Sequence, residues 1–196
     1  LPRGKTLGGS SSTNAMAYVR GNQEDYNDWE KSGCKGWGFQ DVLPYFKKSQ
    51  NQVRGANEFH GDKGELSVID SPSDNLLYDK FVDAGVEAGY PRNPDFNGAS
   101  QEGFGRYQCT IKDHKRHSTA AAFLSPIKSR TNLTIACDSQ VSRVLLEGNK
   151  AQGVEYRKGK RKNLEQVYAN KEVILCAGTI QSPHILQLSG IGRPED

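Results

Sequence analysis

Near the C-terminal end of the sequence, an uninterrupted apolar run stands directly before a turn and a helix pattern. Val173–Ala177 carries no polar side chain, which is typical of a strand buried on both faces. Gly178 follows the run, and residues 182–188 read as a helix with Pro at its start and Gly190 at its stop. A buried strand, a small-residue turn and a helix are half of a nucleotide-binding α/β layer. The sequence therefore predicts an α/β fold built around this unit.

The residues before this unit favour an antiparallel meander. Strands are predicted over Leu133–Ala136 and over residues 141–147, 151–157 and 163–169. Residues 157–162 then form a hairpin tip that carries five positive charges. A solvated turn accounts for this charge. The alternative is a nucleic-acid contact, but the aromatic interleaving typical of such surfaces is missing apart from Tyr156.

Short helices dominate the first half of the sequence. Asn22 followed by Asp25 indicates a helix start, with Gly33 as its stop. A second helix is expected over residues 39–49, where Pro44 favours a start of the helix proper near Val42 or Leu43. The remaining predictions are a strand at 66–69, a helix opened by Ser73 with Leu77 and Phe81 on its apolar face, an irregular stretch at 90–105, and a short helix capped by Ser118.

Composition narrows the class of protein. The 196 residues hold 26 Lys and Arg against 23 Asp and Glu, and the net charge of +3 is too small to imply nucleic acid or a membrane. No apolar run approaches the roughly 20 residues of a membrane span, and no leader pattern opens the chain, which reads as soluble. The sequence begins without Met and stops directly after a helix pattern. We expect the middle portion of a larger protein.

The cysteines and histidines give little evidence of a metal or redox site. The four cysteines match no zinc or redox spacing, and Cys176, inside the apolar run, is expected to be a small buried side chain. His114 and His117 are spaced as two metal ligands could be, but two cations stand between them, so a solvated surface is the favoured interpretation. His60 and His184 stand alone in the sequence.

The strongest local feature is the glycine- and serine-rich stretch of residues 4–17. Its paired glycines permit a close backbone approach to a ligand, and its hydroxyls can donate to phosphate oxygens. A helix beginning near Asn14 would aim free N–H groups at the same place. The alternative is a flexible linker, but a linker would not run directly into Asn-Ala-Met-Ala-Tyr-Val. The stretch matches neither a Walker loop nor Gly-x-Gly-x-x-Gly.

Two long motifs make the sequence similar to a known family. Residues 4–14 with Tyr18-Val19-Arg20-Gly21, and residues 178–192, resemble the two signatures of the glucose-methanol-choline (GMC) flavoprotein oxidoreductases. Between them, residues 36–46, 95–103 and 116–126 also resemble the family, in particular its choline- and alcohol-dehydrogenase-like members. The resemblance implies an incomplete α/β, Rossmann-like FAD-binding domain with part of an α+β substrate-binding domain. Residues 1–50 and 131–196 would belong to the first, and residues 51–130 would begin the second.

The resemblance also implies FAD contacts in the first signature and on one later strand. Gly9 and Ser10 would form the close-approach turn, and Val141 would give a main-chain contact to the adenine. The remaining contacts carried over from the family fall on Thr6, Asn14, Ala15, Met16 and Ala17. Some members bind the flavin covalently through a His placed where this sequence has Thr13, so we expect non-covalent FAD.

The activity implied is oxidation of a small-molecule alcohol to an aldehyde or ketone by hydride transfer to the flavin. Electrons would pass to a quinone or to oxygen, and the implied location is cytoplasmic or membrane-peripheral. The catalytic His of the family, with its His or Asn partner, matches no position here, so this chain alone is expected to be inactive. The alternative is a non-catalytic GMC-like protein that only binds FAD or another ligand. A nucleic-acid module is disfavoured.

Overall fold

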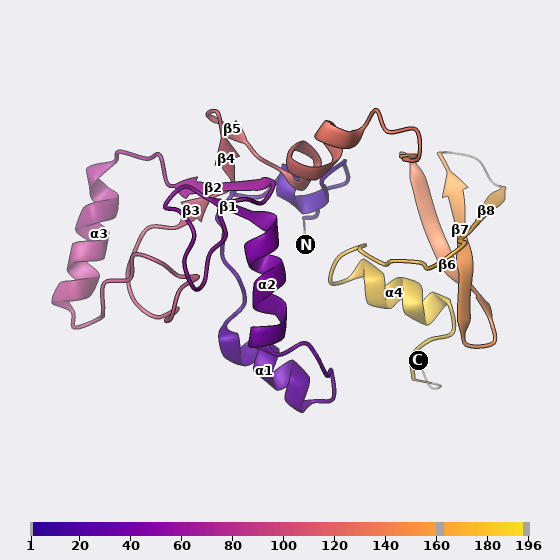
Figure 1. Cartoon of the computed structure of the whole chain (residues 1–196), viewed down its shortest axis with the longest axis horizontal. Coiled ribbons are helices and arrows are strands. Elements are labelled where there is room, and N and C mark those ends of the chain that lie inside the picture. Colours follow the sequence, from indigo (N-terminus) through magenta and orange to yellow (C-terminus); the bar gives the residue numbers. More distant parts are fainter. Residues whose placement is uncertain (1, 160–162, 194–196) are drawn as a thin grey trace. The chain divides into compact units, whose positions relative to one another are not determined.

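The computed structural model describes residues 2–159 and 163–193, which divide into two compact units, Leu1–Leu133 and Thr134–Asp196 (Figure 1). No helix among the described residues combines the length and the apolar character needed to cross a bilayer. The assignment of residues 1–50 and 131–196 to a cofactor domain and of residues 51–130 to a substrate domain stays a prediction, because this division into units does not bear on it. Three residues of the basic tip, 160–162, lie outside the described residues.

The first unit contains small sheets and helices. Strand β2 (Leu66–Asp70) lies at the centre of a three-stranded sheet, parallel to β1 (Gln50–Gln52) and antiparallel to β3 (Gln108–Cys109). Strands β4 (Ile111–Lys112) and β5 (Lys115–Arg116) form a separate hairpin. Val68 of β2 is fully buried, so this sheet holds part of the core. The elements in chain order are η1 (Gly9–Ser12), α1 (Gln23–Lys31), α2 (Phe39–Ser49), β1 (Gln50–Gln52), β2 (Leu66–Asp70), α3 (Leu76–Glu87), β3 (Gln108–Cys109), β4 (Ile111–Lys112), β5 (Lys115–Arg116), the π-helix η2 (Ala120–Leu124) and η3 (Ser125–Ile127).

The predicted cap of α1 is confirmed. The Asn22 side chain accepts a hydrogen bond from the Glu24 N–H, and the Asp25 carboxylate accepts one from the Asn22 N–H at 2.8 Å, which completes a capping box. The predicted bounds of α2, residues 39–49, are confirmed, but the later start near Val42 or Leu43 is wrong. The helix begins at Phe39, because the Gly38 carbonyl already closes the first turn and Pro44 removes only the bond to the carbonyl of exposed Gln40.

Helix α3 differs from its prediction in its start and in its buried face. The side chain of Asn75, rather than Ser73, caps the helix by accepting from the Leu77 N–H at 3.0 Å. Leu77 is 72% exposed, and the buried residues are instead Val82 and Gly85. Gly85 lies so close to the Phe104 ring that even a methyl group would collide with it. The contact of Gly85 with Phe104 therefore sets the packing of the helix. Phe81 touches the same ring, with the ring centroids 5.5 Å apart, whereas Leu76 and Leu77 are largely exposed.

The second unit is a three-stranded antiparallel meander with one helix. Its elements are β6 (Ser139–Glu147), β7 (Lys150–Lys158), β8 (Leu164–Tyr168) and α4 (Gln181–Leu188). Helix α4 is fixed to β6 by a hydrogen bond from the Val144 N–H to Ser189 Oγ at 2.8 Å. Buried Val144 and Ile185 provide the apolar contact of this unit. Three of the four predicted strands are thereby confirmed.

Two predicted strands are absent from the structure. Residues 133–136 have no strand structure, and Val173–Ala177, expected as a strand buried on both faces, has none either. Cys176 is exposed rather than buried. A strand requires a paired neighbour for its backbone groups, and no described residue pairs with this run. The turn at Gly178, with φ 95°, and the following helix form as predicted.

Candidate functional site

The glycine- and serine-rich loop is an ordered turn, with a short 3-10 helix, η1, at its centre. Gly8 and Gly9 both have left-handed backbone conformations, with φ of 83° and 53°. A Cβ at Gly8 would lie 2.5 Å from Ser12 Oγ and 3.1 Å from the Cβ and the backbone nitrogen of Ala120, so both the positive φ and the packing favour glycine there. At Gly9 a Cβ would meet no atom within 4 Å. The Gly9 N–H donates to the Thr6 carbonyl, and Gly4 packs against the Gly9 carbonyl. The open space at Gly9 is therefore the place where a side chain would stand, and another molecule can approach the Gly9 Cα there.

The helix predicted to begin near Asn14 does not form. The Asn14 side-chain oxygen accepts a hydrogen bond from the Met16 N–H at 3.0 Å, which makes an Asx turn in place of a helical one. Met16 then adopts a positive φ of 65°, and its carbonyl accepts from the Thr110 N–H at 2.9 Å. Ala17 continues as a bridge to Cys109 of β3. The loop is thus joined to the sheet edge in extended form.

The loop presents free hydrogen-bond donors to its surroundings. Within the described chain, the N–H groups of Ser10 and Ala15 have no acceptor, and the side chains of Thr6, Ser10, Asn14 and Ala17 are exposed. Backbone N–H groups and hydroxyls around a glycine turn are the groups that cradle phosphate oxygens. The residues present therefore suit an anionic, nucleotide-like group.

The segment that follows β4 holds this loop in place, and the residue-by-residue reasoning missed it. The Thr119 N–H donates to Ser11 Oγ at 3.0 Å, and Ser11 Oγ lies 3.0 Å from Thr119 Oγ1. Arg116 donates to the Asn14 carbonyl and to its side-chain oxygen, both at 2.7 Å. More than 100 residues separate these partners in sequence, so no local pattern could reveal them. Only the family-like motif that begins at Arg116 indicated that this segment matters.

The chain leaving the loop is fixed by a buried polar cluster around Arg20. Its guanidinium donates to Gln50 Oε1 at 2.7 Å and to the Phe59 carbonyl at 2.8 Å, with the Phe46 ring 5.0 Å from its centre. His60, which has no other histidine near it in the sequence, is 2% exposed in the structure. Its Nδ1 lies 3.0 Å from Gln50 Oε1, and its Nε2 lies 2.7 Å from Asp95 Oδ2. Burial raises the pKa of Asp95, but the hydrogen bonds from His60 and the Asn97 N–H outweigh it, so the net direction is downward.

His114 and His117 do not share a surface. His114 is exposed, whereas His117 is 7% exposed and its Nδ1 accepts a hydrogen bond from the Ser67 N–H. The solvated interpretation is therefore wrong for His117, because its ring is used to tie β2 to the start of η2. Among the described residues, no group of three or more potential ligands could hold a metal ion.

Val141, the predicted adenine contact, lies in the second unit on strand β6. It pairs with Tyr156 of β7 next to a register shift between Val141 and Arg143. Among the described residues β6 is an edge strand, with a sheet neighbour on one side only.

The sequence profile described as GMC oxidoreductase matches residues 1–196. The chain belongs to the GMC oxidoreductase family. It is 48% identical over 195 residues to the human mitochondrial choline dehydrogenase, and 48% identical over 197 residues to the oxygen-dependent choline dehydrogenase of Proteus mirabilis. These alignments cover 100% and 99% of this chain but 32% and 35% of the relatives, so the chain spans about a third of their length.

Solved GMC structures have the same fold over this region. The pyridoxine 4-oxidase of Mesorbium loti aligns with 98% of the chain and 38% of its own, at a TM-score of 0.84 and 34% identity. An FAD-dependent oxidoreductase from Chaetomium thermophilum aligns with 100% of the chain over 36% of its own length, at a TM-score of 0.89 and 29% identity. The family and the incomplete α/β fold class predicted from the sequence are confirmed.

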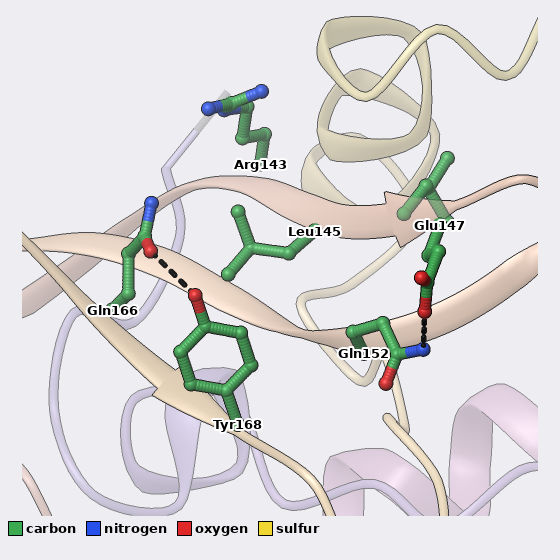
Figure 2. Close-up of a pocket in the computed structure, with 7 residues that line it drawn as sticks. Arg143, Leu145, Glu147, Gln152, Gln166 and Tyr168 are labelled. Carbon is green, nitrogen blue, oxygen red and sulfur yellow. Dashed lines mark hydrogen bonds between the residues drawn. The ribbon is translucent and has the colours of Figure 1, made fainter.

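A separate hollow of about 510 Å³ lies on the meander, on the face of β6, β7 and β8 that carries Leu145 and Tyr168 (Figure 2). Gly153 stands between these two residues in the sheet and contributes no side chain to the surface. Polar groups around the hollow already bond to one another, as Gln152 does to Glu147 at 2.6 Å and Tyr168 to Gln166 at 2.8 Å. The hollow contains none of the residues that the GMC signatures indicate.

Proposed function

We propose that this chain supplies part of the cofactor site of an FAD-dependent oxidoreductase that converts a small-molecule alcohol to an aldehyde or ketone. The observation that carries the proposal is the cradle of residues 4–17, in which the side-chain position of Gly9 is empty and the N–H groups of Ser10 and Ala15 have no acceptor in the described chain. The match to choline dehydrogenases along the whole chain supports the choice of substrate class. When bound, FAD supplies an acceptor for a hydride.

Each part of the loop would have its own role toward the cofactor. The exposed Thr6 and Ser10 would donate to phosphate oxygens through their hydroxyls, and the empty side-chain position of Gly9 would permit close contact. Asn14 through Ala17 would lie along the flavin, with Met16 turned by its positive φ. Val141 would offer a main-chain contact to the adenine.

We infer that the FAD is held without a covalent bond. Residue 13 is a threonine, whose hydroxyl donates to the Ser10 carbonyl at 3.4 Å and is a far weaker nucleophile toward a flavin than an imidazole. Acid precipitation of the full-length protein should release all of its flavin into the supernatant. Flavin that stays with the precipitate would contradict this inference.

The decisive experiment uses the full-length protein. We expect the purified protein to show flavin absorbance, and choline added without oxygen to bleach it as the flavin is reduced. Flavin absorbance without bleaching by choline or a panel of other alcohols would favour the non-catalytic alternative. A folded protein without flavin, unable to take up added FAD, would overturn the proposal.

The electron acceptor and the location are part of the same proposal. The Proteus mirabilis relative is named an oxygen-dependent choline dehydrogenase, and the Mesorbium loti structure is named an oxidase. Comparing oxygen consumption with reduction of a soluble quinone during turnover identifies the acceptor. Fractionation of cells tests the expected cytoplasmic or membrane-peripheral location, and DNA retention at low salt tests the expectation that nucleic acid is not a partner.

A further inference from the structure

One side chain from outside the signature holds three oxygens of the cofactor loop. Arg116, at the end of β5, donates from a single nitrogen, Nη1, to the Asn14 carbonyl and the Asn14 side-chain oxygen, both at 2.7 Å, and to the Ser11 carbonyl at 3.3 Å. The guanidinium is partly buried against the loop. A charged donor of this kind makes stronger hydrogen bonds than a neutral one.

The residue that this contact ultimately controls is Met16. Its φ of 65° is unfavourable for any residue with a Cβ, so the surroundings must hold it there. On one side its N–H donates to the Asn14 side-chain oxygen at 3.0 Å, and on the other its carbonyl accepts from the Thr110 N–H at 2.9 Å. The same Asn14 oxygen is bound by Arg116, so Arg116 fixes the amide orientation that Met16 needs.

We propose that Arg116 is a positioning residue, which holds Asn14 and through it the strained Met16 in the conformation that receives the flavin. The inference rests on the proposed function, because it assigns to Arg116 a role in the same FAD site. Arg116 arranges the loop before the cofactor arrives, so FAD does not have to order the loop as it binds. Without this side chain the Asn14 amide can rotate, and Met16 relaxes to a negative φ.

The first measurement is FAD affinity in the full-length protein, after the cofactor is removed and titrated back. Arg116→Gln should weaken FAD binding by about tenfold or more. Lys115→Gln is the matched control, since Lys115 is the exposed neighbour on β5 and should bind FAD as the wild type does. Arg116→Lys should recover part of the affinity, because one nitrogen makes all three bonds and an ammonium carries three donors.

Repeating the Arg116→Gln substitution in a Met16→Gly protein separates a positioning effect on FAD affinity from a general loss of stability. Glycine adopts a positive φ without penalty, so Met16→Gly removes the strain that Arg116 is proposed to hold. In this background the effect of Arg116→Gln on FAD affinity should shrink to about threefold or less. A loss of affinity that is equally large in both backgrounds would overturn the role through Met16. The comparison of the two backgrounds tests the positioning role even if Arg116→Gln lowers the melting temperature.

A third measurement needs no cofactor. In the cofactor-free protein, amide hydrogen exchange across residues 11–16 should be faster in Arg116→Gln than in the wild type or in Lys115→Gln. Wild-type protein that binds no FAD would defeat the proposed function itself. Wild-type protein that binds FAD, together with an Arg116→Gln variant of equal affinity and equal exchange, would defeat only the positioning role.

Discussion

The ring of His117 is fixed as a neutral hydrogen-bond acceptor by the backbone of Ser67. The Ser67 N–H donates to His117 Nδ1 at 3.0 Å. A backbone amide nitrogen can only donate, so Nδ1 must be the ring nitrogen without a proton. His117 stands directly between Arg116 and Ser118, at the start of the segment that contacts the cofactor loop. Protonation of Nδ1 would therefore remove a bond that connects β2 to this segment.

This bond predicts a loss of stability in mild acid. Burial is the main cause that lowers the pKa of His117 below its ordinary value of 6.5, and Lys112 adds to it while Asp113 and Glu65 oppose it. Because the unfolded chain takes up the proton more readily, stability should fall as the pH decreases through about 6.5 toward the folded-state pKa. Thermal unfolding of the full-length protein across this range measures the slope.

His117→Asn is the informative variant for this slope. The asparagine oxygen can still accept from the Ser67 N–H but does not titrate, so the loss of stability as the pH falls through about 6.5 should flatten. The exposed His114→Asn should keep the wild-type slope. A His117→Asn protein with an unchanged slope would rule out this histidine as its source.

Local patterns in the sequence predicted elements that depend on local chemistry. The cap at Asn22 and the strands β6, β7 and β8 form because side-chain caps and alternating apolar positions act within a few residues. The run Val173–Ala177 could not be judged in this way. Its strand character depends on neighbours in a sheet, and no described residue pairs with it.

The backbone of the candidate loop could be predicted in part, because it also depends on short-range chemistry. Glycines with positive φ are readable in the sequence, and Gly8 and Gly9 lie where the motif placed them. The Asx turn at Asn14 replaced the expected helix because Asn14 bonds with both Met16 and distant Arg116. Contacts between residues 100 positions apart follow from tertiary packing and have no local signal.

Alanine substitutions at the two glycines of the loop should have different effects on stability and on FAD binding. At Gly9 a methyl group meets open space, so Gly9→Ala should cost only the backbone strain of about 1–2 kcal/mol but should weaken FAD binding. At Gly8 the same strain is joined by a clash with Ser12 Oγ, so Gly8→Ala should cost about 3 kcal/mol.

A third glycine provides the control for this pair. Gly33 also has a positive φ, of 109°, and open space around it, but it ends α1 away from the loop. Gly33→Ala should therefore lower the free energy of unfolding without changing FAD affinity. Chemical denaturation and FAD titration of all three full-length variants test the prediction. Equal FAD affinities in Gly9→Ala and Gly33→Ala would contradict a special role for the backbone at Gly9.

Gly85→Ala should destabilise the protein although alanine is the better helix former. In a free helix the change would gain about 1 kcal/mol. Here the new methyl group would collide with the Phe104 ring, and forcing such a group into a packed contact costs about 1–3 kcal/mol. Val86→Ala, at the next and partly exposed position of α3, should change stability by about 0.5 kcal/mol or less. Urea denaturation compares the two, and a stabilised Gly85→Ala variant would show that α3 packs elsewhere.

Arg20→Met should cost about 3 kcal/mol of unfolding free energy, because it leaves the buried Gln50 and Phe59 oxygens without their charged donor. The matched control is Arg54→Met, which breaks a solvent-exposed ion pair with Asp70 and should cost about 1 kcal/mol or less. Both variants remove one positive charge and keep an apolar stem, so the difference between them measures burial. Guanidinium denaturation of the full-length proteins gives that difference. If the two variants lose equal stability, the buried cluster does not hold the chain leaving the cofactor loop.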